Sequence, residues 1–149
     1  MQLTQQIKVN STPAQETVLL ALSEKCRLIY NFALSEKKEA FDKNIKGINY
    51  IKQQNDLPEI KKKFPEYIWV YSKVLQYTLR TLDANFRSFF ALNRKGNMEA
   101  KPPKFRGKQF FTTMVHNQSG FKARKGVIEL SHNHPTKTKL RFVIPEKFV

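Results

Sequence analysis

The sequence has few of the residues on which hydrolytic, redox and disulfide chemistry depend. Cys26 is the only cysteine, which excludes an internal disulfide, and its place among the apolar positions of a predicted helix favours a buried thiol over a nucleophile. The 12 Asp and Glu residues are scattered, whereas hydrolytic metal sites need carboxylates or histidines that converge on an ion. None of the spacings GxxxxGKS/T, GxSxG, HExxH or CxxC occurs. We therefore expect no catalytic residue, no metal ligand and no cofactor in this chain.

Histidine is also rare, with His116, His132 and His134 as the three examples. On a strand, His132 and His134 would lie on the same side, and His116 would be a conceivable third metal ligand. The proline that follows at 135 instead favours an exposed turn. The letters HNH at 132–134 are no nuclease signature, because that motif spreads its residues over a longer fold.

Long apolar runs are missing as well. No stretch approaches the roughly 20 apolar residues of a membrane span. The first residues, MQLTQQ, contain no charged leader followed by an apolar run, which is the pattern of a secretory signal. We therefore expect a cytoplasmic, nucleoid-associated protein with no membrane partner.

Positive charge, by contrast, is abundant. The chain of 149 residues has 27 Lys and Arg, and its net charge is +15. A field of this size recruits polyanions, and nucleic acid is the commonest polyanion that a soluble domain meets. The 12 Phe and five Tyr are many for this length; most should be core, but some could stack on bases.

The clearest pattern is a row of cations at intervals of seven residues, which we call the cationic ridge: Lys73, Arg80, Arg87 and Arg94. Between them runs the apolar stripe of an amphipathic helix: Leu75, Leu79, Leu82, Phe86 and Phe89. Seven residues are nearly two helical turns, so the ridge drifts by only about 20° per step. One side of this helix should pack, and the other should offer a row of positive charge to a ligand or, in the simpler interpretation, only to solvent.

The first two thirds of the chain predict one strand and three helices. Alternating apolar residues predict a strand over 3–9. Thr12, Pro13 and Gln15 predict a capping box and a helix that runs to about Asp42. Asn49 should cap a second helix that breaks near Pro58. Residues 61–67 read as a loop. Ser72 should cap the third helix, which should end between residues 93 and 96.

The last third of the chain predicts extended segments and short strands in place of helices. The two prolines in 101–108 predict an extended backbone. Four short β-like runs follow, at 109–116, 121–123, 127–130 and 137–144. In the last one, apolar residues alternate with Lys139 and Arg141, which predicts a half-buried strand with a basic outer face. This order of elements predicts an α+β fold in which helices are inserted into a sheet.

Five segments of the chain resemble one protein family in order and approximate spacing. They are TPAQE (12–16), CRLIYNFAL (26–34), INY (48–50), LQYTLRTLDANFRSFF (75–90) and KPPKFRGK (101–108). The chain resembles the N-terminal part of TnpB-type (OrfB) proteins, which are transposon-encoded RNA-guided DNA nucleases related to type V CRISPR effectors. In older descriptions this part is a transposase helix-turn-helix domain.

The resemblance implies a partial antiparallel β-barrel, called the wedge, that is interrupted after its first strand by a three-helix recognition domain. The implied division is 1–10 for the first wedge strand, 11–100 for the helical recognition domain and 101–149 for the remaining, incomplete wedge. In the family, the nuclease domain with its divalent metals and zinc follows the wedge. Because the sequence does not reach these parts, we expect a fragment or a truncated copy of such a protein, or one half of a split protein whose nuclease part is a separate chain.

The resemblance also implies functional residues. Those at the family's motif-reading positions, together with a neighbouring lysine, are Tyr50, Ser72, Lys73, Gln76, His116 and Asn117. Lys73 is included because the family often has a basic residue where Ser72 stands. Gln and Asn can pair bidentately with adenine, and Tyr can pack on a sugar or a thymine methyl. Binding of RNA phosphates is predicted for basic residues of the ridge and the wedge: Arg27, Arg80, Arg87, Arg94, Lys104, Arg106, Lys108, Lys122, Arg124, Lys139 and Arg141.

We therefore predict a nucleic-acid-binding module that binds guide RNA and reads a short target-adjacent motif on duplex DNA. One alternative is a stand-alone helix-turn-helix DNA-binding repressor or accessory transposition protein. Another is a basic structural RNA-binding protein that reads no motif.

Overall fold

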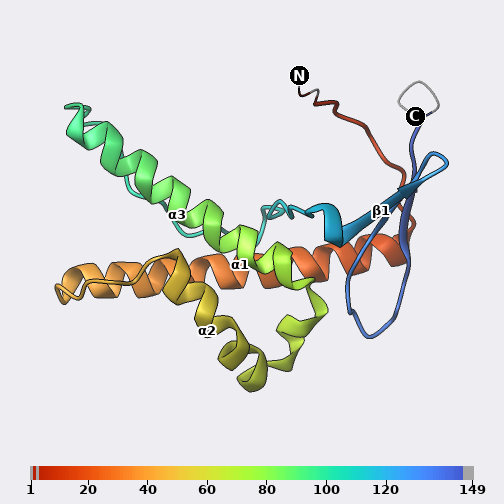
Figure 1. Cartoon of the computed structure of the whole chain (residues 1–149), viewed down its shortest axis with the longest axis horizontal. Helices are drawn as coiled ribbons and strands as arrows, with labels where there is room; N and C mark the ends of the chain where they lie inside the picture. The colour runs from red at the N-terminus through yellow and green to blue at the C-terminus, as the bar shows by residue number, and fades with distance from the viewer. Residues whose placement is uncertain (1, 3, 146–149) are drawn as a thin grey trace.

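A computed structural model describes residues 2 and 4–145 of the chain. Its elements are three α-helices and three β-strands, with two short 3-10 helices between them. The predicted α+β class is confirmed. Figure 1 shows the long first helix with the third helix crossing it, and the strands beside the N-terminal end of the first helix.

Helix α1 (Pro13–Asp42) has the predicted bounds and the predicted cap. The Gln15 backbone N–H donates to Thr12 Oγ1 at 3.1 Å, and the Thr12 N–H donates to Gln15 Oε1 at 2.9 Å. The same Gln15 side chain donates from Nε2 to the carbonyls of Lys139 and Arg141 at 3.0 and 3.2 Å. The capping residue therefore also attaches the start of α1 to the last strand.

Helix α2 (Tyr50–Lys63) is capped by Asn49, as predicted, but it does not break at Pro58. The predicted break at Pro58 was therefore wrong. The segment 61–67, which was predicted to be a loop, is helical over its first residues, because α2 ends at Lys63. Proline inside a helix costs about 3 kcal/mol or more through one lost hydrogen bond and a clash with the preceding turn. On either side of it, Leu57 is buried and Ile60 packs against the core. Tertiary packing of these two residues offsets the cost.

A 3-10 helix, η1 (Pro65–Trp69), leads into α3 (Ser72–Arg94). The end of α3 is as predicted, but its start is not: Tyr71 is the N-cap residue, and no side chain caps the helix. Ser72 is already helical, and its hydroxyl accepts a hydrogen bond from Lys61 Nζ at 2.9 Å.

The strands form one open antiparallel sheet in the order β1-β2-β3: β1 (Phe121–Arg124), β2 (Val127–Leu130) and β3 (Leu140–Val143). The short 3-10 helix η2 (Gln118–Gly120) precedes β1. The last three predicted runs therefore contain the strands. In β3, Leu140 and Phe142 are buried whereas Arg141 and Val143 are exposed, which confirms the half-buried pattern.

Two predicted strands are not formed. Residues 4–10 and 109–116 have no strand structure, and Leu3 lies outside the described residues. In the second segment the N–H and C=O of Thr112 bond the Ser23 hydroxyl of α1 at 2.7 and 2.9 Å. In the predicted strand, the backbone groups of Thr112 would pair with a neighbouring strand. In the structure they bond the Ser23 side chain of α1 instead. The barrel, and the division into wedge and recognition domains, stay predictions.

The core lies where α1 and α3 cross and where the sheet meets α1. Its residues include Leu22, Cys26 and Ile29 of α1, Leu75, Leu79 and Leu82 of α3, and Leu140 and Phe142 of β3. Burial raises the pKa of Cys26 to about 11, so its sulfur is a protonated core thiol, as predicted. No helix in the described residues is long and apolar enough to cross a membrane.

Candidate nucleic-acid interface

The residues predicted to read a DNA motif come from three separate segments, and a chain of contacts links these segments. Tyr50 is the first residue of α2, Ser72, Lys73 and Gln76 lie in the first turns of α3, and His116 and Asn117 precede η2. Two sets of contacts, described next, link the first and last of these segments to α3.

The first set links α3 to the loop at His116 and Asn117. The Tyr71 hydroxyl lies 2.5 Å from Ser119 Oγ, and Ser119 Oγ donates to Asn117 Oδ1 at 2.8 Å. Gly120 lies so close to the Tyr71 ring that a Cβ atom there would be 3.0 Å from a ring carbon. Asn117 is therefore held beside the N-terminus of α3.

The second set links α3 to the start of α2. The Arg80 guanidinium lies over the rings of Tyr50 and Tyr77, with its central carbon 5.2 and 5.6 Å from their centroids. Gln76 precedes Arg80 by four residues, so the two share a helix face. We call the surface formed by Tyr50, Ser72, Lys73, Gln76 and Asn117 the reading face.

Two further groups beside the reading face, His116 and Lys61, have pKa values below their ordinary ones. Burial lowers the pKa of His116, so its imidazole is neutral at pH 7 and can donate or accept a hydrogen bond. Burial also lowers the pKa of Lys61, whose ammonium donates to Ser72. The sequence did not indicate Lys61, Tyr71 or Ser119, because their positions depend on the continuation of α2 and on contacts between distant segments.

The cationic ridge is exposed along the whole of α3, as predicted. Its members differ in their neighbours. Arg80 stacks on tyrosines, whereas the Arg87 guanidinium pairs with the Asp83 carboxylate at 2.9 Å. The intervening Asp83 therefore offsets part of the charge at the middle of the ridge.

The sheet presents a second basic surface. The register pairs Lys122 with Glu129 and Glu129 with Arg141, which places the three side chains on one face of the sheet. Lys139 and Arg141 lie 3.7 and 3.9 Å from Glu129. With Arg124 also exposed, this face has four cations and one carboxylate.

Two of the predicted phosphate-binding residues have structural roles. Arg27 is 7% exposed; its guanidinium binds the Glu24 carboxylate and donates to the Arg106 carbonyl at 3.0 Å. The guanidinium of Arg106 lies 3.8 Å from the Tyr30 ring centroid, and its backbone bonds the Asn31 side chain at 2.8 and 2.9 Å. The Arg27 guanidinium is thus engaged inside the fold, and its binding to phosphate stays a prediction. Lys104 and Lys108, on the same segment, are exposed.

The histidines at 132 and 134 form a turn, as the sequence favoured. His132 Nε2 lies 2.6 Å from the Thr138 carbonyl, and its Nδ1 accepts the His134 N–H at 3.0 Å. His134 packs edge-on against Trp69. Within residues 2 and 4–145, no group of three or more His, Cys, Asp or Glu side chains is placed to hold a metal ion.

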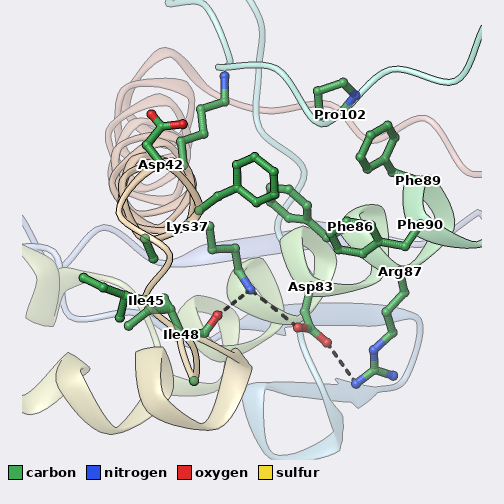
Figure 2. Close-up of a pocket in the computed structure, with 14 residues that line it drawn as sticks. Lys37, Asp42, Ile45, Ile48, Asp83, Phe86, Arg87, Phe89, Phe90 and Pro102 are labelled. Atoms are coloured by element: carbon green, nitrogen blue, oxygen red, sulfur yellow. Dashed lines mark hydrogen bonds and ion pairs between the residues drawn. The ribbon is translucent and has the colours of Figure 1, made fainter. Parts of the chain in front are cut away.

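A cavity of about 530 Å³ lies between the C-terminal halves of α1 and α3. Figure 2 shows Phe86, Phe89 and Phe90 of α3 on one side of it and Ile45 and Ile48 on the other. The Lys37 ammonium points between the Ile48 carbonyl and the Asp83 carboxylate, at 3.2 and 3.7 Å. The cavity is mainly apolar and is lined by none of the reading-face residues.

A comparison with models of known protein families found a match over residues 1–46. They match the model of the helix-turn-helix domain of the OrfB/IS605 transposase family, which confirms the resemblance to TnpB/OrfB proteins in this segment. Such a domain supports DNA as a partner of this chain. No curated protein matches the chain.

The matched segment contains a single helix within its described residues, α1, which ends at Asp42. A helix-turn-helix motif places its second helix in the major groove. Here the next helix, α2, begins only at Tyr50, beyond the match. The second helix of the chain therefore lies outside the matched segment.

Proposed function

We propose that this chain is the nucleic-acid-binding module of a TnpB-type protein. In this proposal the reading face contacts base edges of a short duplex motif. The exposed cations of the ridge and the outer face of the sheet bind guide-RNA phosphates. No catalytic role is proposed for these residues.

The observation that carries the proposal is the chain of contacts from Tyr50 through Arg80 to α3 and on through Tyr71 to Asn117. The family resemblance assigns Tyr50, Gln76 and Asn117 to motif reading. These residues are far apart in the sequence, and the contacts connect Tyr50 and Asn117 to the first half of α3, which contains Gln76. Base readout needs several side chains at fixed relative positions, whereas phosphate contacts only position the protein. The reading face supplies polar side chains held by contacts to α3, and the exposed cations of the ridge and the sheet supply the phosphate contacts.

The test measures sequence preference separately from overall affinity. Gln76→Ala, Asn117→Ala and Tyr50→Ala should each reduce the preference for one duplex sequence, selected from a random pool, while affinity for unrelated duplexes stays nearly constant. Each good bidentate contact discriminates by about 1–3 kcal/mol. Asn93→Ala, which removes an exposed amide from the last turn of α3, is the matched control.

The measurement is made with and without an added pool of structured RNAs. Variants that keep the full preference would contradict the assignment of the reading face. A wild-type chain with no duplex preference under either condition would instead favour a structural RNA-binding protein, and a preference that is independent of RNA would favour a repressor.

A further inference from the structure

Tyr71 occupies an unusual place at the start of α3. It is the N-cap residue, with φ −56° and ψ 132°, but its side chain makes no capping bond to the helix. The hydroxyl reaches the Ser119 side chain instead, 48 residues further along the chain. Tyr71 therefore joins the first turn of α3 to the loop that holds Asn117.

Two hydrogen bonds connect Tyr71 to Asn117 through Ser119, and both are donated in the same direction along this chain. Ser119 has a single hydroxyl hydrogen, and it donates this hydrogen to Asn117 Oδ1 at 2.8 Å. The Tyr71 hydroxyl, 2.5 Å from Ser119 Oγ, must then be the donor of the other bond. The chain runs Tyr71 O–H to Ser119 O–H to the Asn117 carbonyl oxygen.

The ring of Tyr71 is held as closely as its hydroxyl. A Cβ on Gly120 would lie 3.0 and 3.1 Å from two carbons of the Tyr71 ring and 3.3 Å from the His116 ring. Only a residue without a side chain leaves this space for the ring. The position of the hydroxyl is thus fixed by packing as well as by hydrogen bonding.

This arrangement decides which group Asn117 offers to a ligand. Its oxygen is turned towards Ser119, and within the described residues no hydrogen bond uses its Nδ2. An amide that presents its N–H₂ group recognises hydrogen-bond acceptors, which in the major groove are O6 and N7 of guanine, N7 of adenine and O4 of thymine; cytosine presents only a donor there. Bidentate pairing with adenine would also need the oxygen to accept from adenine N6.

We infer that Tyr71 is a positioning residue that acts through Ser119 to orient the Asn117 amide as a donor, and that Asn117 thereby discriminates against cytosine, the one base without a major-groove acceptor. This inference rests on the proposed function, since it specifies how one residue of the reading face reads its base. It extends the possibility drawn from the residue type alone, which was bidentate pairing with adenine.

The test is selection from a random duplex pool with the wild-type chain and the variants Tyr71→Phe, Ser119→Ala and Asn117→Asp, with and without RNA as above. Tyr71→Phe and Ser119→Ala should each weaken the discrimination against cytosine at one position by roughly three- to ten-fold, the effect of one lost hydrogen bond. Preferences at the other positions should stay constant. Asn117→Asp replaces a donor by an acceptor and should move the preference at that position towards cytosine or adenine.

Tyr77→Phe is the matched control, because it removes a tyrosine hydroxyl from the same helix at a position whose ring contacts Arg80. A purely structural role of Tyr71 would lower affinity equally for all sequences. Retention of the preference in both hydroxyl variants, or an unchanged preference in Asn117→Asp, would overturn the inference and leave the proposed function intact. A wild-type chain with no preference would overturn the proposed function and this inference together.

Discussion

The two halves of α3 have the same sequence pattern and different surroundings. In the first half, Leu75, Leu79 and Leu82 are at most 2% exposed in the contact with α1. In the second half, Phe86 and Phe89 continue the apolar stripe but are only partly buried, and Phe90 beside them is 46% exposed. The helices diverge here and leave the cavity of Figure 2 between them.

The difference shows that a periodic apolar stripe indicates which side of a helix faces its neighbour. It does not indicate how deeply each residue of the stripe is buried. The spacing of Leu82, Phe86 and Phe89 places them on one side of α3. How far each is buried depends on the distance to α1, which the stripe itself does not encode. The first half of α3 is thus fixed in the core, and it carries the α3 members of the reading face, Ser72, Lys73 and Gln76, on a rigid support.

The largest effect that tests this comparison is on stability. Leu82→Ala should lower the free energy of unfolding by about 2–5 kcal/mol, since Leu82 is 0% exposed and its loss leaves a cavity. Phe89→Ala should cost only about 1 kcal/mol, because its ring borders a space that is already open. Urea denaturation of both variants measures the difference. Equal costs would show that the second half of α3 is packed as tightly as the first.

The next effect is on binding to nucleic acid. Each ridge arginine that contacts a phosphate contributes about 0.9 to the slope of log affinity against log salt concentration. The combined change of Arg80, Arg87 and Arg94 to Gln should therefore reduce that slope by up to about three. Titrations of RNA and of duplex DNA at several salt concentrations measure it.

The single variants in this series compare the two halves. Arg80→Gln should affect binding more than Arg87→Gln, because Asp83 already pairs with the Arg87 guanidinium. The control changes Lys46, Lys62 and Lys63, which are exposed cations outside the ridge, to Gln. An equal loss of slope in this control would mean that net charge, and not the ridge, governs binding.

Local signals in the sequence predicted most of the helices. The capping box at Thr12 and the cap at Asn49 are confirmed because their bonds lie within a few residues of each other. The break at Pro58 was wrong because the packing of Leu57 and Ile60 is a tertiary effect that no local rule contains. The expected strand at 109–116 failed for the same reason, since Ser23 takes the Thr112 backbone groups.

The candidate site was predictable in part. A family resemblance was enough to choose Tyr50, Gln76 and Asn117, but the residues that connect them could not be found in this way. Tyr71 and Ser119 become visible only when the start of α3 and the turn at η2 are placed together. The burial of Arg27 against Glu24 was also not predictable, because charge in the sequence cannot distinguish a buried guanidinium from one that faces solvent.

The smallest expected effect concerns the ion pair at the junction of the two halves of α3. Lys37 reaches Asp83 with its side chain 11% exposed, and burial lowers its pKa, although Asp83 partly offsets this. In the unfolded chain a lysine titrates near its ordinary pKa of about 10.4. Between the lowered pKa and this value, the unfolded state binds more protons than the folded state, so the contribution of Lys37 to stability rises with pH.

The measurement is therefore the difference in unfolding free energy between the wild-type chain and Lys37→Met, followed from neutral pH to about pH 10. We expect this difference to move in favour of the wild type as the pH rises. Asp83→Asn removes the charge that raises the lysine pKa, so in that background the rise should begin at a lower pH. Lys43→Met, at the exposed C-cap residue of α1, where the lysine pairs with Glu39, is the control for titration at the surface. A difference that is independent of pH in both backgrounds would mean that Lys37 is solvated, and that the cavity between the two helices is open to water at its ion pair.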